Sequence, residues 1–247
     1  MRSKVNTMAV YNTVKNYYVN TLQKFNPNVQ VISKSSLIMT APITTGTTNL
    51  TFQSNATSGG ASPWEIRVQQ TDTFSFYRLG VYAYGIQGTS TGPAGTTGNK
   101  YWTYVPTQMN SSFLAIAPLW DSGSIKMTLN GRQYQKSLST SQCYEAPRTQ
   151  DGPFQPLTTS GASNNAYISS QCQGDAGMMD IEPFITLSGA WNNEISIILP
   201  YGISPISNFA YVGDANDIYF SINYVNIVLE GLLVQNSSSI LPADFSM

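Results

Sequence analysis

The chain has 247 residues and a net charge of −1, and only 10% of its residues are charged, while Ser, Thr, Asn and Gln together number 88. A hydrophobic content of 41% is enough to form a sizeable core, which excludes a disordered chain. The sequence has no histidine, so it lacks the usual general base, the commonest metal ligand and a member of Ser and Cys catalytic triads.

The first 30 residues form a basic N-terminal arm. Apolar side chains recur at spacings of three and four between residues 8 and 25, which predicts an amphipathic helix that ends before Pro27. Two interpretations stay open: the helix packs on its own β domain, or it contacts another subunit, an internal membrane or nucleic acid. The candidate residues of this membrane or assembly arm are Arg2, Lys4, Tyr11, Val14, Lys15, Tyr18, Leu22, Lys24 and Phe25.

Beyond residue 30 the pattern is one of short β-rich runs separated by turn residues. Several runs alternate apolar and polar residues, which is typical of strands with one solvated face. No helical run alternates with them, so we expect an all-β chain with antiparallel sheets. The predicted strands cover residues 29–39, 49–53, 64–69, 73–87, 101–105, 113–120, 124–129, 132–138, 181–187, 194–199, 217–224 and 226–235.

The number of strands exceeds that of one eight-stranded jelly roll, and this favours two rolls of about 110 residues each. We therefore expect an arm over residues 1–30, a first antiparallel eight-stranded jelly roll over 31–138 and a second over 139–247, with a boundary between 120 and 145. A single jelly roll with elaborate loops stays open as the alternative, and only the number of strands argues against it. The dipeptide Asn130-Gly131 predicts a tight hairpin between two strands. Low-charge loops are expected at 54–63, 88–99 and 145–177.

Few residues suggest a catalytic, redox or metal-binding site. Gly88–Gly92 matches a nucleophile-elbow pattern, but such an elbow needs a histidine, so we interpret it as loop. Cys143 and Cys172 either pair or remain as two inert thiols, and the latter is preferred. No cofactor and no metal are expected, although two groups of acids, given last, leave a structural calcium ion open. These acids are Asp175, Asp180 and Glu182, and Asp214 and Asp217.

Four tryptophans and abundant amides would also suit carbohydrate binding, since aromatic rings stack on sugars. Each tryptophan lies in or beside a predicted strand, however, where aromatic residues more often fill the core. The four residues are Trp64, Trp102, Trp120 and Trp191. Basic residues outside the arm are scattered and outnumbered by acids, so specific nucleic-acid recognition is not expected. No apolar stretch is long enough to span a membrane, and the N-terminus lacks the apolar region of a secretory signal.

A histidine-free, amide-rich all-β chain with a basic amphipathic arm resembles viral coat proteins. It is similar to the double jelly-roll major capsid proteins of icosahedral bacteriophages with an internal membrane, the corticovirus-like and finnlakevirus-like group. The segments that suggest this are the arm from Tyr11 to Phe25 leading into VISKSSLIMTAPI, and the late strands PFITLSGAWNNEISIILP and NYVNIVLEGLLVQN.

The resemblance implies a major capsid protein that forms homotrimeric, pseudo-hexagonal capsomers of an icosahedral shell. Its partners would be neighbouring capsomers, penton or minor capsid proteins and an internal lipid membrane beneath the arm. It would reside in the virion after assembly in the host cytoplasm, and it would not be an enzyme. A carbohydrate-binding β-sandwich, such as a phage spike or adhesin head, is the main alternative, and a β-sandwich glycosidase or lyase is a weaker one.

Overall fold

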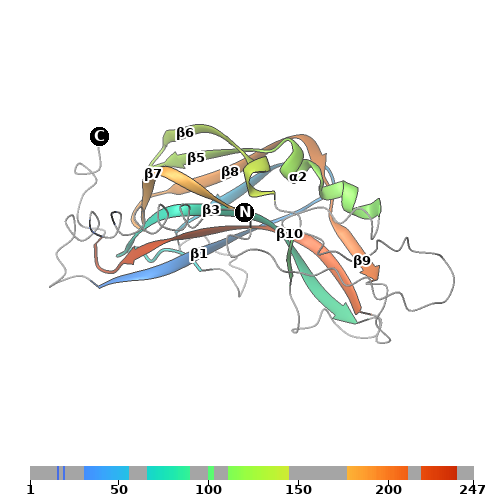
Figure 1. Cartoon of the computed structure of the whole chain (residues 1–247), viewed down its shortest axis with the longest axis horizontal. Coiled ribbons are helices and arrows are strands. Elements are labelled where there is room, and N and C mark those ends of the chain that lie inside the picture. Colours follow the sequence, from blue (N-terminus) through green and yellow to red (C-terminus); the bar gives the residue numbers. More distant parts are fainter. Residues whose placement is uncertain are drawn as a thin grey trace, which may run out of the picture.

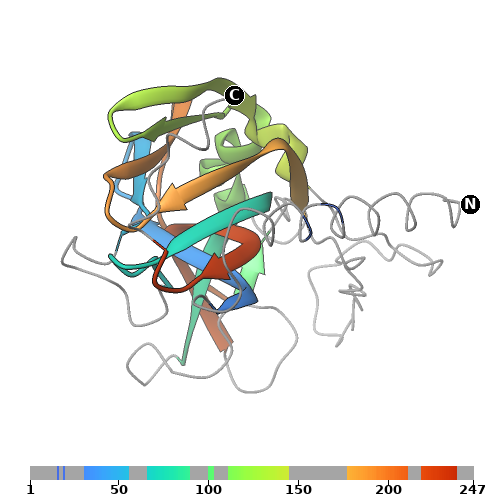
Figure 2. The same ribbon diagram turned by 90° about the vertical axis from the view of Figure 1, so that its left-hand side faces the viewer.

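The computed structural model describes residues 16, 19, 31–55, 66–89, 100–102, 111–144, 177–210 and 218–237. Their strands form two antiparallel sheets that face each other (Figures 1 and 2). The strands are β1 (Ile32–Pro42), β2 (Thr47–Gln53), β3 (Thr73–Thr89), β4 (Lys100–Trp102), β5 (Ser124–Leu129), β6 (Arg132–Ser139), β7 (Met178–Ser188), β8 (Asn193–Ile203), β9 (Ile206–Ala210) and β10 (Ile218–Val234). Three short helical turns are η1 (Ser111–Ile116), α2 (Pro118–Asp121) and η2 (Thr140–Cys143).

The first sheet, called sheet A here, has the order β1-β10-β3, and β3 continues to β7 along one half and to β4 along the other. Its short strand β9 pairs with β10. The second sheet, sheet B, has the order β2-β8-β5-β6. In Figure 1, the strands of sheet A lie side by side from β7 to β1. The all-β prediction is confirmed.

The strand pairs are nested along the chain. Leaving out the short β4 and β9, eight strands remain, and they pair first with last (β1 with β10), second with seventh (β2 with β8), third with sixth (β3 with β7) and fourth with fifth (β5 with β6). Nested pairing of this kind results when one long antiparallel hairpin wraps around itself, as in a jelly roll.

The predicted division into a first roll over 31–138 and a second over 139–247 is not the one observed among the described strands. Two separate rolls would pair strands within each half of the chain. Instead, β1 pairs with β10, β2 with β8 and β3 with β7, and each of these pairs crosses residue 138. Both sheets therefore combine strands from the two halves, and the described strands form one sandwich.

The core lies between the two sheets. Inward positions alternate along β1 and β8, where Leu37, Met39, Ile195 and Ile197 are buried. Alternation by two is what a strand with one face on the core produces. The longest strands, β3 and β10, are paired along most of their length, with register shifts at Ile222/Tyr224 and Glu230/Gly231. These bulges bend the two strands locally.

The hairpin prediction at Asn130-Gly131 is confirmed. Both residues have positive φ, 48° and 74°, and they join β5 to β6 with Leu129 opposite Arg132. Positive φ at both central positions is the requirement of the type I′ turn, which matches the twist of the flanking strands.

The strand predicted at 113–120 is wrong, because this segment forms η1 and α2 instead. Pro118 lies at the first position of α2, where its missing N–H costs nothing. Ile116, Leu119 and Trp120 are spaced by three and four, so a helical turn buries all three at once. The strands predicted at 217–224 and 226–235 are parts of one strand, β10, over Ile218–Val234. Of the strand predicted at 64–69, the described residues contribute only isolated bridges at Ile66 and Val68.

Candidate interaction surface

The outer faces of the two sheets differ in chemistry. The outer face of sheet B presents small polar side chains and single charges, among them Asn49, Thr51, Lys126, Thr128 and Ser196, all exposed or half-buried. Hydroxyl and amide groups of this kind can contact water or a neighbouring protein without the desolvation penalty of charges. This face is chemically suited to a wet interface.

The outer face of sheet A carries a second hydrophobic cluster, separate from the core. It consists of Ile32 in β1, Leu232 in β10, Tyr77 in β3 and Phe184 in β7, and we call it the outer cluster. Its members come from four adjacent strands, so they cross the whole width of the sheet. Tyr77 and Leu232 are only 6% and 5% exposed.

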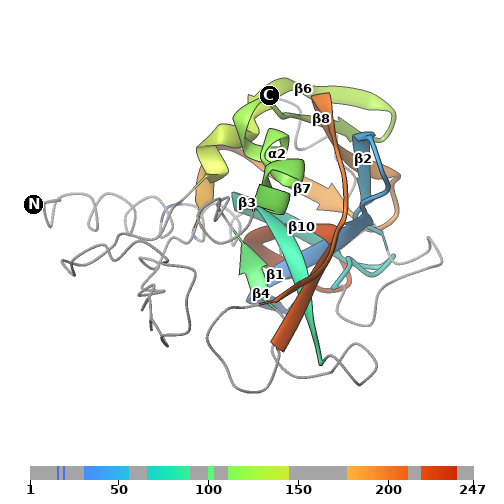
Figure 3. The ribbon, with the colours of Figure 1, turned by 90° about the vertical axis from the view of Figure 1, so that its right-hand side faces the viewer.

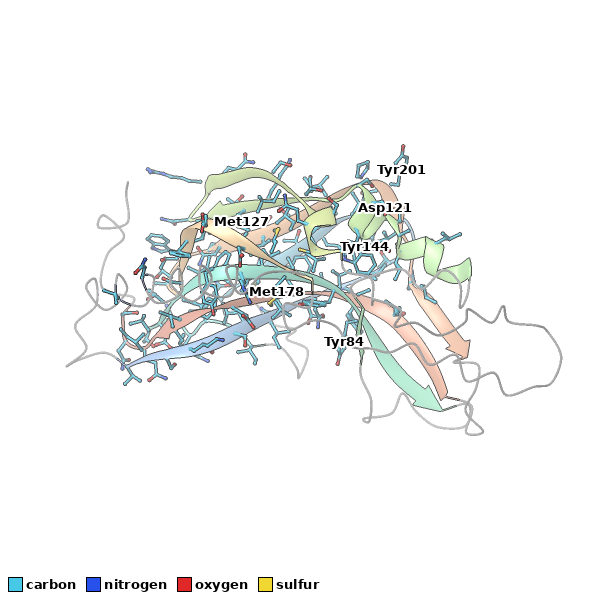
Figure 4. All side chains as sticks on the ribbon, viewed as in Figure 1. Tyr84, Asp121, Met127, Tyr144, Met178 and Tyr201 are labelled. Carbon is cyan, nitrogen blue, oxygen red and sulfur yellow. The ribbon has the colours of Figure 1, made fainter. Side chains whose placement is uncertain are left out.

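Aromatic side chains continue along the same face of β3. Tyr82 is 7% exposed and Tyr84 is 1% exposed, and both alternate with the core residues Val81 and Ala83. The ring of Tyr82 lies over Gly80, because a Cβ built on that glycine would be 2.6 Å from Tyr82 Cε2. Figure 4 shows Tyr84 projecting from the side of β3 that faces away from β5 and β6.

One buried amide interrupts this aromatic face. Asn226 of β10 lies opposite Thr40 of β1 and Tyr82 of β3, and it is completely buried. Neither Nδ2 nor Oδ1 of Asn226 has a hydrogen-bond partner within the described ranges. A buried amide without hydrogen-bond partners lowers the stability of the folded state by about 1–3 kcal/mol. A donor and an acceptor from outside the described residues would remove this cost.

Charges border the outer cluster. Arg78 Nε donates to Asp180 Oδ1 at 2.9 Å, and Arg78 lies opposite Glu230 on β10. Glu182 of β7 is exposed nearby on the same strand face as Asp180. Acidic groups therefore outnumber basic ones around the β7 and β10 side of this face.

Three exposed side chains belong to or follow elements that pack around α2 at one end of the sandwich, and we call them the end patch. They are Leu114 in η1, Tyr144 after η2 and Tyr201 in β8, which are 59%, 45% and 71% exposed. The ring of Tyr144 meets the buried ring of Trp120 edge-on, with centroids 6.4 Å apart. Figure 3 shows α2 beside β8 at this end, and Figure 4 labels the two tyrosines.

Cys143 is a free thiol in the core. Its Sγ donates to the carbonyl of Leu79 at 3.7 Å. Burial raises the pKa of Cys143 from 9.0 to about 11, against smaller lowering contributions from backbone hydrogen bonds at Val81 and Met179. A thiol in this state is not a nucleophile at neutral pH.

The nine predicted arm residues, Arg2 to Phe25, lie outside the described residues. Within their span only Asn16 and Val19 are described; both are helical and exposed. Trp120 fills the core as expected, and its Nε1 donates to the Val81 carbonyl at 3.3 Å. Trp191 is half-buried, while the side chains of Trp64 and Trp102 fall outside the described part.

Only two of the possible calcium ligands are described: Asp180 forms an ion pair with Arg78, and Glu182 is exposed on β7. The other three acids, Asp175, Asp214 and Asp217, lie outside the described ranges, as does Cys172, the possible disulfide partner of Cys143. Among the residues that are described, no group of three His, Cys, Asp or Glu side chains is arranged to hold a metal ion. Within the same residues, no helix is long and apolar enough to cross a membrane.

Sequence reasoning missed the outer cluster. The segment TFSFYRLGVYAYG in β3 has bulky residues at both alternating sets of positions, which indicates a strand that is buried on both faces. That pattern is the feature of the sequence from which a buried outer face of β3 could have been predicted. Comparisons of the chain with protein-family models, with curated proteins and with solved structures gave no match.

Proposed function

We propose that this protein is a virion structural protein, a capsid subunit whose copies build a shell. The observation that supports it most is the nested pairing of eight strands, an arrangement found in many viral capsid proteins. A rigid sandwich with extensive polar and apolar outer faces suits a protein that works through many repeated contacts between identical copies.

The expected double roll would give two sandwiches in each chain, whereas the described strands form one. A homotrimer would contribute three sandwiches from the described residues, so a capsomer of six sandwiches would require six chains. The basic arm would face the inside of the shell, toward neighbouring subunits or an internal lipid membrane. No catalytic role is proposed.

The test is assembly of the full-length protein, imaged by negative-stain electron microscopy with and without anionic lipid vesicles. We expect closed shells of uniform size. A quadruple charge reversal in the arm, R2E/K4E/K15E/K24E, should leave the fold intact by circular dichroism and reduce shell formation or co-sedimentation with vesicles. The matched control is the charge-preserving variant R2K/K4R/K15R/K24R, which changes the same four positions and should assemble like the unmodified protein.

An unchanged yield of shells from the quadruple variant would contradict the role of the arm. The absence of any assembly by the unmodified protein would contradict the capsid function itself.

Carbohydrate binding is the second candidate, supported by the exposed rings of Tyr144 and Tyr201 at the end patch. Aromatic rings exposed at one end of a sandwich can stack on sugars. A glycan array tests it, with Tyr201→Ala as the variant that should lose any binding. No binding by the unmodified protein would exclude this candidate.

A further inference from the structure

We propose that the outer face of sheet A is the docking surface of the chain's own N-terminal segment, residues 8–25. The starting observation is burial: Tyr77, Leu232, Tyr84 and Asn226 face away from the core, yet each is at most 6% exposed. The described helical turns pack elsewhere: α2 against β8 and η2, η1 against β9, and η2 against β3 and β7 on the core side, where its Cys143 belongs to the core. None of them covers the outer face, and the proposed occupant is therefore a segment outside the described ranges.

The chain enters the sandwich at this surface. Ile32, the first residue of β1, is itself a member of the outer cluster. The six residues 26–31 can extend over about 20 Å, while four adjacent strands span about 14 Å between their outer axes. A segment that ends at Phe25 can therefore reach any strand of sheet A.

The segment also matches the surface in length and in hydrophobicity. A helix over residues 8–25 is about 27 Å long. The outer face of β10 from Tyr224 to Leu232 has the same length, about 27 Å. Of the long stretches outside the described ranges, 145–176 is rich in Gly, Ser, Pro and Gln and shows no such stripe, whereas residues 8–25 carry one, formed by Tyr11, Val14, Tyr18, Leu22 and Phe25.

The two described residues of the segment have the orientation that docking requires. Asn16 and Val19 are helical and exposed. At about 100° per residue, Asn16 points about 160° away from the centre of the apolar stripe and Val19 about 100° away. The residues that are seen to face solvent are thus the ones that a docked stripe would leave outside.

Hydrogen bonding favours the same partner, whereas charge does not discriminate. Asp180, Glu182 and Glu230 border the outer cluster, but Arg78 pairs with Asp180, and Lys34 of β1 lies opposite Leu232 on the same face. A tyrosine of the stripe has a ring for the aromatic face and a hydroxyl that can both donate and accept. Such a hydroxyl would satisfy the buried amide of Asn226.

The experiment is cross-linking of cysteine pairs in the full-length chain, on a background in which Cys143 and Cys172 are replaced by alanine. The test pair is Tyr18→Cys with Val228→Cys, where Val228 lies on the outer face of β10 beside Asn226. One control pair, Tyr18→Cys with Ser196→Cys, keeps the cysteine in the segment and moves the other cysteine to the outer face of sheet B. A second control pair, Asn16→Cys with Val228→Cys, keeps the cysteine on β10 and moves the other cysteine to the opposite side of the predicted helix.

With a short bis-maleimide, we expect the test pair to form an intramolecular cross-link at least tenfold faster than either control. Thermal melting of each variant verifies that it is folded. Equal rates for the three pairs would overturn the proposal, because they would show that the segment has no fixed site. A cross-link found only in dimers would also overturn it, because the face would then bind the segment of a second copy.

The outcome is independent of capsid assembly. The cross-link is measured in unassembled protein, so the docking can be present in a chain that forms no shell, and absent in one that does.

Discussion

At the scale of single residues, Cys143 shows how burial sets chemical behaviour. Its pKa rises from 9.0 to about 11 in the folded state, so the neutral thiol is favoured by folding. The resulting stability is fully present below pH 9 and is lost as the pH rises through 11, because the unfolded chain releases its proton first. The maximum effect is about 2–3 kcal/mol.

We therefore expect the free energy of unfolding to fall more steeply between pH 9 and pH 11 in the unmodified protein than in Cys143→Ala. Urea denaturation at a series of pH values measures both slopes, and the comparison removes the contributions of tyrosines and lysines common to the two proteins. Parallel slopes would show that the thiol is accessible to water in the folded state.

Two glycines of sheet A provide a matched pair of steric tests. A Cβ on Gly231 would lie 2.0 Å from the Ser75 carbonyl oxygen, which is backbone of the neighbouring strand. Gly231→Ala should lower the free energy of unfolding by about 3 kcal/mol. The three atoms nearest to a Cβ on Gly80 all belong to the end of the Tyr82 side chain rather than to backbone, so a small shift of that side chain can relieve the clash and Gly80→Ala should cost about 1 kcal/mol.

Chemical denaturation of both variants gives the two values. A larger loss for Gly80→Ala than for Gly231→Ala would contradict the described position of the Tyr82 ring or the register of β3 and β10.

At the scale of elements, the hairpin between β5 and β6 depends on the left-handed conformation of its turn. Gly131 has φ of 74°, which a β-branched residue tolerates poorly. Gly131→Val should therefore destabilise the protein by about 1–2 kcal/mol. Gly131→Asn is the control and should lose less, since Asn adopts this conformation more easily. Equal melting temperatures for the two variants would contradict the type I′ turn.

Local patterns predicted most strands but not the helical turns. Alternation identified β5, and the Asn-Gly pair identified the turn that joins β5 to β6, because these features depend on residues close in sequence. The segment 113–120 was misread because an apolar run suits a buried strand and a buried helical turn equally well. Pro118 was the clue in favour of the helix.

At the scale of the whole molecule, the number of strands suggested two rolls, whereas three pairs of described strands cross residue 138. The pairing of Ile32 with Val234 joins the first and the last described strand. Such long-range pairing leaves no trace in local periodicity. The outer cluster was missed for the same reason, since its four members become neighbours only when the strands pair.

The central claim is that copies of this chain associate into a shell, and absolute mass in solution tests it most directly. Light scattering after size exclusion should give assemblies that are multiples of 27.0 kDa, with closed particles in images of the same fractions. A 27.0 kDa monomer at every protein concentration and ionic strength, with no particles, would contradict the capsid function.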